Sequence, residues 1–220
     1  MSYYIYLIPL TLSALLSLRT FRAGWAKHFR YFSVFLLLSL LVEILAILWK
    51  WGLCKTAYWS YSTSNLWIYN AFLPIRYLVL LVFFHGLIVV PAVKLAIRWI
   101  AAPFLLFSIL NYFFIQTPHH ASTYTIIACN AITVLLSLCF FFQIPKIKPL
   151  IHLTRSAGIW ICLGLLLYHA GTLPLFIFFD YLITKHLSLA LSYFYINDLL
   201  NILTNLIYLI AFLCQSRSQQ

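Results

Sequence analysis

Acidic residues are almost absent from this chain of 220 residues, which has three Asp and Glu against 14 Lys and Arg. Charged residues make up 8% of the sequence and apolar residues 65%, and the mean hydropathy is +1.00. A soluble domain carries about 25% charged residues. The composition therefore excludes a soluble protein and predicts an integral membrane protein whose first partner is the lipid bilayer.

The chain also lacks the patterns of metal sites and of several membrane enzymes. The five cysteines form no CxxC pair, and the adjacent His119 and His120 have no nearby carboxylate or third ligand, so a solvated turn is expected there. There is no GxSG or GxGD motif of an intramembrane protease, and no lysine for a retinal Schiff base in the middle of the last apolar run. A zinc-dependent lipid hydrolase needs about three clustered histidines, whereas only His85 and His169 lie deep. We expect no metal, no cofactor and no catalytic residue.

Long apolar runs are abundant. A bilayer core about 30 Å thick needs roughly 20 apolar residues per helix. The sequence predicts an all-α fold, in which residues 1–220 form a single domain of seven transmembrane helices. The expected helices are Tyr3 to Leu18, Tyr31 to Trp51, Leu66 to Val90, Leu95 to Phe114, Tyr124 to Phe142, Ala157 to Phe179, and Leu187 to Leu213. A signal peptide is the competing interpretation of the first run, but that run has no basic segment before it and no small-x-small cleavage site.

Basic residues predict the orientation. Most lie in the breaks after the first, third and fifth runs or in the tail, which the positive-inside rule places in the cytoplasm. These residues are Arg19, Arg22, Lys27, Arg30, Lys94, Arg98, Lys146, Lys148, Arg155 and Arg217, against Lys50, Lys55 and Lys185 on the other side. We therefore expect the N-terminus outside and the C-terminus inside. Since the net charge of +11 is divided among short loops and forms no continuous patch, nucleic acid is not an expected partner.

Polar residues interrupt the last run in the stretch INDLLNILTN. Asn197, Asn201 and Asn205 recur every four residues and form one stripe on a helix, which Tyr208 continues, and Asp198 borders it. A charge in the middle of the membrane costs about 2.5 to 3.5 kcal/mol on insertion scales. The stripe must therefore face protein or water.

Titratable residues on other helices lie at a similar depth. At 1.5 Å per residue, Glu43 and Arg76 lie roughly 12 and 15 Å below the outer helix ends, and Asp198 and His169 roughly 16 Å. Asn130 is a further candidate for this layer. Because Arg76 cannot lose its charge, we expect it to pair with Glu43, Asp198 or both.

Two interpretations of this polar layer stay open. A buried network of ionic and carboxamide groups can hold helices together. Alternatively, ionisable groups within a membrane often mark ligand, ion or proton sites. Convergence of polar groups from at least four helices favours a pocket that opens to the outside.

Three stretches, NLWIYNAFLPIRYLVLLVFF, IWICLGLLLYHAGTLPLF and NDLLNILTNLIYLIAF, resemble segments of an uncharacterised family of small seven-helix membrane proteins common in Bacteroidota. In that family the pattern resembles N-x-W-x-Y followed by I-E-Y, then Y-F-x-G-N, then N-x-x-x-N-x-x-Y. The matching residues are Glu43, Asn65, Trp67, Tyr69, Gly171, Asn201, Asn205 and Tyr208. Two positions depart from the pattern: Arg76 replaces the glutamate of I-E-Y, and Thr172, which we include in the candidate pocket, replaces the last asparagine of Y-F-x-G-N. The resemblance implies a seven-helix protein of the bacterial cytoplasmic membrane.

These patterns together predict a non-enzymatic, receptor-like or sensor membrane module with an unknown ligand. Such a module would pass its signal to a separate signalling or membrane partner protein. A small transporter for a polar solute or ion is the first alternative, since Pro74 and Pro174 could break their helices as transport folds require. A structural subunit of a membrane complex is the second.

Overall fold

A computed structural model describes residues 5–22, 24–52, 64–116, 120–147, 156–185 and 187–216. These residues form helices and turns, with no β-strand among them, so the all-helical prediction is confirmed. Six helices are long and apolar enough to cross a bilayer, and Leu7–Phe21 is a shorter apolar helix. The long apolar helices identify an integral membrane protein.

Each of the seven predicted runs contains a helix. The α-helices are α1 (Leu7–Ser17), α2 (Lys27–Trp51), α3 (Leu66–Leu87), α4 (Pro91–Leu110), α5 (Thr123–Ile147), α6 (Ala157–Ile177), α7 (Phe179–Lys185) and α8 (Leu187–Ser216). A 3-10 turn, Leu18–Phe21, extends α1, and a π-helical turn, Asn111–Ile115, extends α4.

Two helices differ from the sequence prediction. The predicted helix Ala157 to Phe179 ends as α6 at Ile177, and the short helix α7 follows it before α8 begins. With its 3-10 extension, the helix Leu7–Phe21 spans about 24 Å, which is less than the hydrocarbon core of about 30 Å. The predicted start of the first run at Tyr3 lies outside the described residues, so a seventh membrane crossing stays a prediction.

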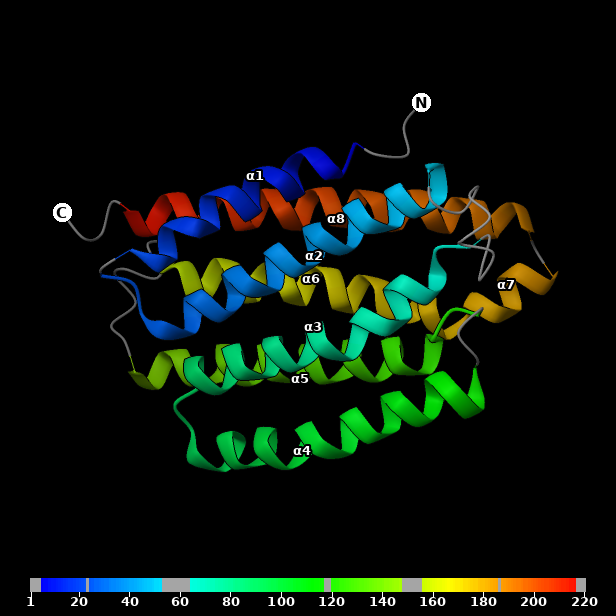
Figure 1. Ribbon diagram of the computed structural model, residues 1–220. Helices are drawn as coiled ribbons and strands as arrows, with labels where there is room; N and C mark the ends of the chain where they lie inside the picture. Colours follow the sequence, from blue (N-terminus) through cyan, green and yellow to red (C-terminus); the bar gives the residue numbers. More distant parts are fainter. Residues whose placement is uncertain are drawn as a thin grey trace.

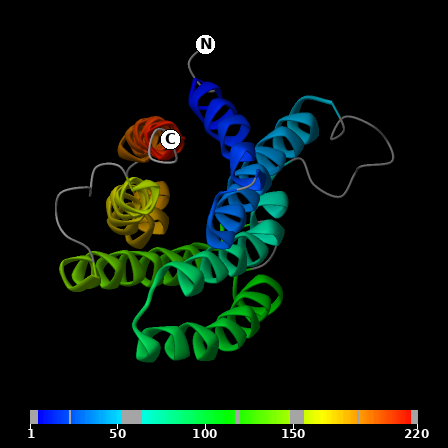
Figure 2. The ribbon, with the colours of Figure 1, turned by 90° about the vertical axis from the view of Figure 1, so that its left-hand side faces the viewer.

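Six helices form a ring. Going round it, α1 packs against α2, α2 against α3, α3 against α5, α5 against α6, α6 against α8, and α8 against α1. Figure 2, viewed along the bundle, shows these helices around a central space with α4 outside the ring, where it packs against α3 and α5. Helices far apart in the sequence, such as α1 and α8, therefore lie side by side (Figure 1).

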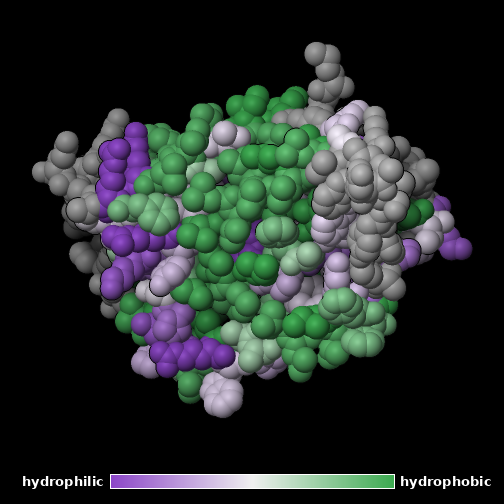
Figure 3. All heavy atoms as spheres, in the orientation of Figure 1, coloured by the Kyte–Doolittle hydropathy of each residue, from purple (hydrophilic) through white to green (hydrophobic). Residues whose placement is uncertain are grey.

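Apolar side chains cover the outside of the bundle. Leu48, Leu106 and Leu135 are more than half exposed, as expected for side chains that face lipid. Figure 3 shows a hydrophobic band across the middle and hydrophilic side chains gathered at the left-hand end. At that end the 3-10 turn after α1 contains Arg19 and α2 begins with Lys27, and both residues are exposed (Figure 1). We call this end the basic end.

The half of the bundle towards the basic end is closely packed. Phe32 of α2 is fully buried, and its ring centroid lies 5.1 Å from that of Phe83 on α3 and 4.9 Å from that of Tyr208 on α8. Ile161 and Leu165 of α6 are also fully buried in this cluster. This half also buries a few hydrogen-bonded polar side chains, among them Thr20, Ser33 and Gln143.

Small residues bring α6 and α8 together. A Cβ atom added at Gly164 would lie 2.6 Å from Cε1 of Tyr208, whose ring is fixed between α6 and Phe32. A Cβ at Gly171 would lie 2.9 Å from Cδ1 of Leu200, the end of a flexible side chain. Glycine at 164 therefore permits the close approach of two helices, as small residues commonly do in membranes.

The substitution Gly164→Ala should lower the free energy of unfolding by about 1 to 3 kcal/mol, the usual cost of overpacking. Gly171→Ala is the matched control and should cost less, because Leu200 can rotate away. Thermal unfolding of the purified chain in detergent measures both. Equal losses in the two variants would show that α6 and α8 do not meet at Tyr208.

Candidate functional site

The ring encloses a cavity of about 390 Å³, within the range of small-molecule pockets. All the predicted site residues except Thr172 line it, and Thr172 is hydrogen-bonded to one that does. The predicted residues that line the cavity are Glu43, Arg76, Asn130, His169, Asn197, Asp198, Asn201, Asn205 and Tyr208. The structure therefore brings the predicted residues together, while their role in binding stays a prediction.

The cavity runs from the middle of the bundle towards the end opposite the basic end. Its deep lining includes Tyr208 and Thr204 of α8. At the far end it is lined by Leu66, the first residue of α3, by Ala121 just before α5, and by Phe179 just after α6. The site thus extends from the apolar core to the ends of three helices.

The side chain of Glu43 is held by two tyrosines. Its Oε2 atom accepts a hydrogen bond from the hydroxyl of Tyr6, at the start of α1, and another from the hydroxyl of Tyr69 on α3, both at 2.8 Å. Charge-assisted bonds of this kind stabilise a carboxylate. Asp198 on α8 lines the same cavity as Glu43. No hydrogen bond to Asp198 is found within the described part of the chain.

The predicted ion pair of Arg76 is wrong. No nitrogen of its guanidinium lies within 4.0 Å of a carboxylate oxygen among the described residues, and its buried Nε atom has no hydrogen-bond partner there. The depth estimates did place Arg76 beside the same cavity as Glu43 and Asp198. Depth, however, does not determine the direction in which a side chain leaves its helix, and the tyrosines occupy one oxygen of Glu43 instead.

A buried network joins α3, α5 and α6 at the side of the cavity. The hydroxyl of Thr172 donates to the backbone carbonyl of Tyr168 (2.8 Å), so it must accept the bond from Nδ2 of Asn130 (3.1 Å). Oδ1 of Asn130 then accepts from the hydroxyl of Tyr77 (3.3 Å) and from Nδ1 of His169 (2.7 Å).

This chain of donors determines the tautomer of His169. Its Nδ1 carries the hydrogen, and in the neutral ring Nε2 is left as an acceptor. His169 is only 3% exposed, so its ring is held almost entirely by protein. Its role in the described structure is to fix Asn130 and Tyr77 at the wall of the cavity.

The asparagine stripe both lines the cavity and joins helices. Nδ2 of Asn201 and Nδ2 of Asn205 each donate to the carbonyl four residues earlier, at 3.1 and 2.9 Å. Oδ1 of Asn205 also accepts from Ser13 on α1 (2.9 Å), and Oδ1 of Asn197 accepts from Tyr168 on α6 (3.3 Å). Each member of the stripe therefore lines the cavity and also bonds to a neighbouring helix.

Sequence reasoning missed the aromatic part of the site. Tyr6 and Tyr69 hold Glu43, and only Tyr69 had a signal, from the resemblance motif. At the far end of the cavity, Phe176, Phe179 and Tyr193 form a cluster in which the ring centroids of Tyr193 and the two phenylalanines lie 5.6 and 5.2 Å apart. Aromatic residues are common in apolar membrane segments, so the sequence did not distinguish these from lipid-facing ones.

Of the described histidines considered for metal binding, His169 lines the cavity, whereas His85 and His120 do not. His119 is outside the described residues, and the backbone carbonyl of His120 accepts a hydrogen bond from Nδ2 of Asn70 (2.7 Å). His85 accepts a hydrogen bond from Nε of Arg98 (3.1 Å) on α4. Within the described ranges, no three His, Cys, Asp or Glu side chains are grouped so that they could hold a metal ion.

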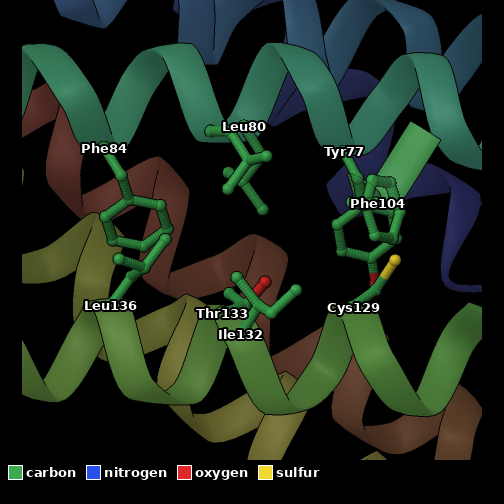
Figure 4. Close-up of a pocket in the computed structure, with 9 residues that line it drawn as sticks. Tyr77, Leu80, Phe84, Phe104, Cys129, Ile132, Thr133 and Leu136 are labelled. Carbon is green, nitrogen blue, oxygen red and sulfur yellow. The ribbon is translucent and has the colours of Figure 1, made fainter. Parts of the chain in front are cut away.

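A second gap lies between α3 and α5 (Figure 4). Side chains from the two helices, among them Leu80, Phe84 and Leu136, point towards one another across it. Its volume is about 10 Å³, with room for one water at most, and its lining is almost entirely apolar. This gap is a packing defect of the core and not a ligand site.

Comparison with known proteins gives no relative: no family model, curated protein or solved structure matches the chain. The resemblance to the Bacteroidota family therefore has no support beyond the motifs themselves.

The contribution of the stripe to stability can be tested by substitution. Asn205→Ala removes the bond between α8 and α1 and should lower the free energy of unfolding by about 0.6 to 1.7 kcal/mol, the range for interhelical hydrogen bonds in membranes. Asn201→Ala is the comparison variant: its Nδ2 donates within α8 and its side chain also bonds to Tyr168 of α6, so this change should cost no more than Asn205→Ala. Thermal unfolding in detergent distinguishes them, and a larger loss at Asn201 would contradict this assignment.

Proposed function

We propose that the protein is a non-enzymatic, receptor-like membrane protein that binds a polar ligand in the cavity inside the helix ring. The observation that carries this proposal is that Arg76, Glu43 and Asp198 line a cavity of about 390 Å³ without an ion pair between the arginine and either acid. Buried polar groups are normally satisfied by protein, water or ligand. A bound polar molecule would supply the missing partners.

Transport is the main alternative, and the helices flanking the cavity favour binding over it. Transporters place broken helices at their substrate sites. Pro74 and Pro174 lie inside α3 and α6, but both helices continue through them. The third interpretation, a structural subunit, is favoured by the bond between Asn205 and Ser13 but does not account for the unpaired charges of the cavity.

We further propose that the chain lies in the bacterial cytoplasmic membrane with its basic end inside. Arg19, Lys27 and Arg98 gather at that end, and the positive-inside rule directs such residues to the cytoplasm. The cavity would then face the outside, with the N-terminus outside and the C-terminus inside. A ligand from the outside would bind there, and a separate signalling or membrane partner would receive the signal.

The orientation is testable in intact cells with single cysteines in a variant whose five native cysteines have been replaced. A membrane-impermeant thiol reagent should modify a cysteine at His120 and should leave one at Lys27 unmodified until the cells are opened. The reverse pattern would contradict the orientation, and modification of both positions in intact cells would contradict the helix arrangement.

Water access to the cavity is testable at one depth of α8. In the same background, a water-soluble thiol reagent should modify Asn201→Cys, because residue 201 lines the cavity. Leu203→Cys is the matched control: Leu203 is 40% exposed on the outer face of the same helix, where lipid excludes the reagent. Protection of both cysteines would indicate a dry centre and would overturn the proposed function.

A further inference from the structure

The three charged groups of the cavity point to the chemical class of the ligand. Resting on the proposed function, we infer that the cavity binds a zwitterion, a molecule in which an ammonium group and an anionic group are a few bonds apart. The ammonium group would lie between Glu43 and Asp198, and the anionic group would lie at Arg76. An ion pair between Arg76 and Glu43 or Asp198 would have neutralised the charges that attract a zwitterion. No such ion pair is formed, and all three residues line the cavity.

The acidic side of the cavity favours a cation. Glu43 and Asp198 come from α2 and α8, and both line the cavity. Two nearby carboxylates repel each other unless a proton or a cation lies between them. The two tyrosine bonds to Glu43 both end on Oε2 and leave Oε1 available. An ammonium group, with its three donors, can bind Oε1 and Asp198 together.

The arginine favours an anion. The guanidinium has five N–H donors and a planar fork that matches a carboxylate or a phosphate. The Nε atom of Arg76 is buried and has no hydrogen-bond partner among the described residues, and the guanidinium forms no ion pair with them. Arg76 follows Tyr69 by seven residues on α3, so the two residues share a face about 10 Å apart along the axis. Side chains as long as tyrosine and arginine can converge over that distance on one small ligand.

The far end of the cavity favours an apolar substituent. Phe176, Phe179 and Tyr193 form the aromatic cluster there, and Phe194 adjoins it with a centroid distance of 6.5 Å to Phe179. An aromatic or aliphatic side chain would bury its surface against these rings. A free amino acid with a large apolar side chain has all three features, and so has the head group of phosphatidylethanolamine with its acyl chains.

A matched set of probes tests this inference with the purified full chain in detergent. L-phenylalanine carries both charges, phenethylamine only the cation, 3-phenylpropionate only the anion, and 2-phenylethanol neither. Direct calorimetric titration should give the tightest binding for phenylalanine, at least tenfold tighter than for each of the others. A short-chain phosphatidylethanolamine is a second zwitterionic probe. If it binds and displaces phenylalanine, the natural source is lipid; if only phenylalanine binds, the source is a free solute.

Charge variants assign the two subsites. Arg76→Gln should make the affinities for phenylalanine and phenethylamine equal. Glu43→Gln should reduce the ratio of the affinity for phenylalanine to that for 3-phenylpropionate. Arg76→Lys, which keeps the charge, should restore part of the first preference. Because Arg76 forms no ion pair with a residue that the structure describes, Arg76→Gln should not lower the melting temperature. This control separates loss of binding from loss of fold.

The outcomes distinguish this inference from the proposed function. Equal affinities for the four phenyl compounds would overturn the zwitterion and leave a binding cavity. If neither phenylalanine nor the lipid binds but the thiol reagent modifies Asn201→Cys, the zwitterion inference is overturned and the hydrated cavity is not. The absence of binding together with protection of that cysteine would overturn both.

Discussion

The structure depends on one constraint: a charged side chain in a bilayer is stable only where protein or water surrounds it. Glu43, Arg76 and Asp198 lie on three helices that each have an exposed apolar face, and each could reach lipid only at a large free-energy cost. The ring of α1, α2, α3, α5, α6 and α8 keeps all three inside. The same ring leaves α4, which buries Ile97, Phe104 and Ser108, as an outer helix that meets no charged group of the cavity.

The bundle is divided into an apolar and a polar half along its length. The cluster around Phe32, Phe83 and Leu165 excludes water and holds the helices together near the basic end. Tyr208 lies at the boundary between this cluster and the cavity. Its ring packs against Phe32, and it also lines the cavity. Apolar packing is thus most extensive towards the basic end, and a smaller cluster of Val42, Trp49 and Ile68 joins α2 and α3 in the other half. Such a division suits a binding protein, because the site can be hydrated without weakening the core.

The sequence predicted the helices and the membership of the site because both follow from one-dimensional quantities. Apolar run length identifies a helix, and the rise of 1.5 Å per residue places Glu43, Arg76 and Asp198 at one depth. Pairing could not be predicted in this way. Whether Arg76 meets Glu43 depends on helix rotation and crossing angle, and two tyrosine hydroxyls hold Glu43 in place of a cation.

Other misses have similar causes. The separation of α7 from α6 was hidden because the apolar run continues through Phe178, where the helix ends without any change in composition. The position of α4 outside the ring was hidden because its sequence is as apolar as that of its neighbours. The sequence predicted Asn130, His169 and Thr172 as members of one layer but not the hydrogen bonds between them. The donor and acceptor of each bond depend on which backbone carbonyl the hydroxyl of Thr172 reaches.

The most direct test of the central claim is a high-resolution experimental structure of the chain in a lipid bilayer. The account predicts ordered water or ligand density in the cavity between Arg76 and the carboxylates of Glu43 and Asp198, with the guanidinium more than 4 Å from both acids. A dry, closely packed centre in which Arg76 pairs directly with Glu43 or Asp198 would contradict it.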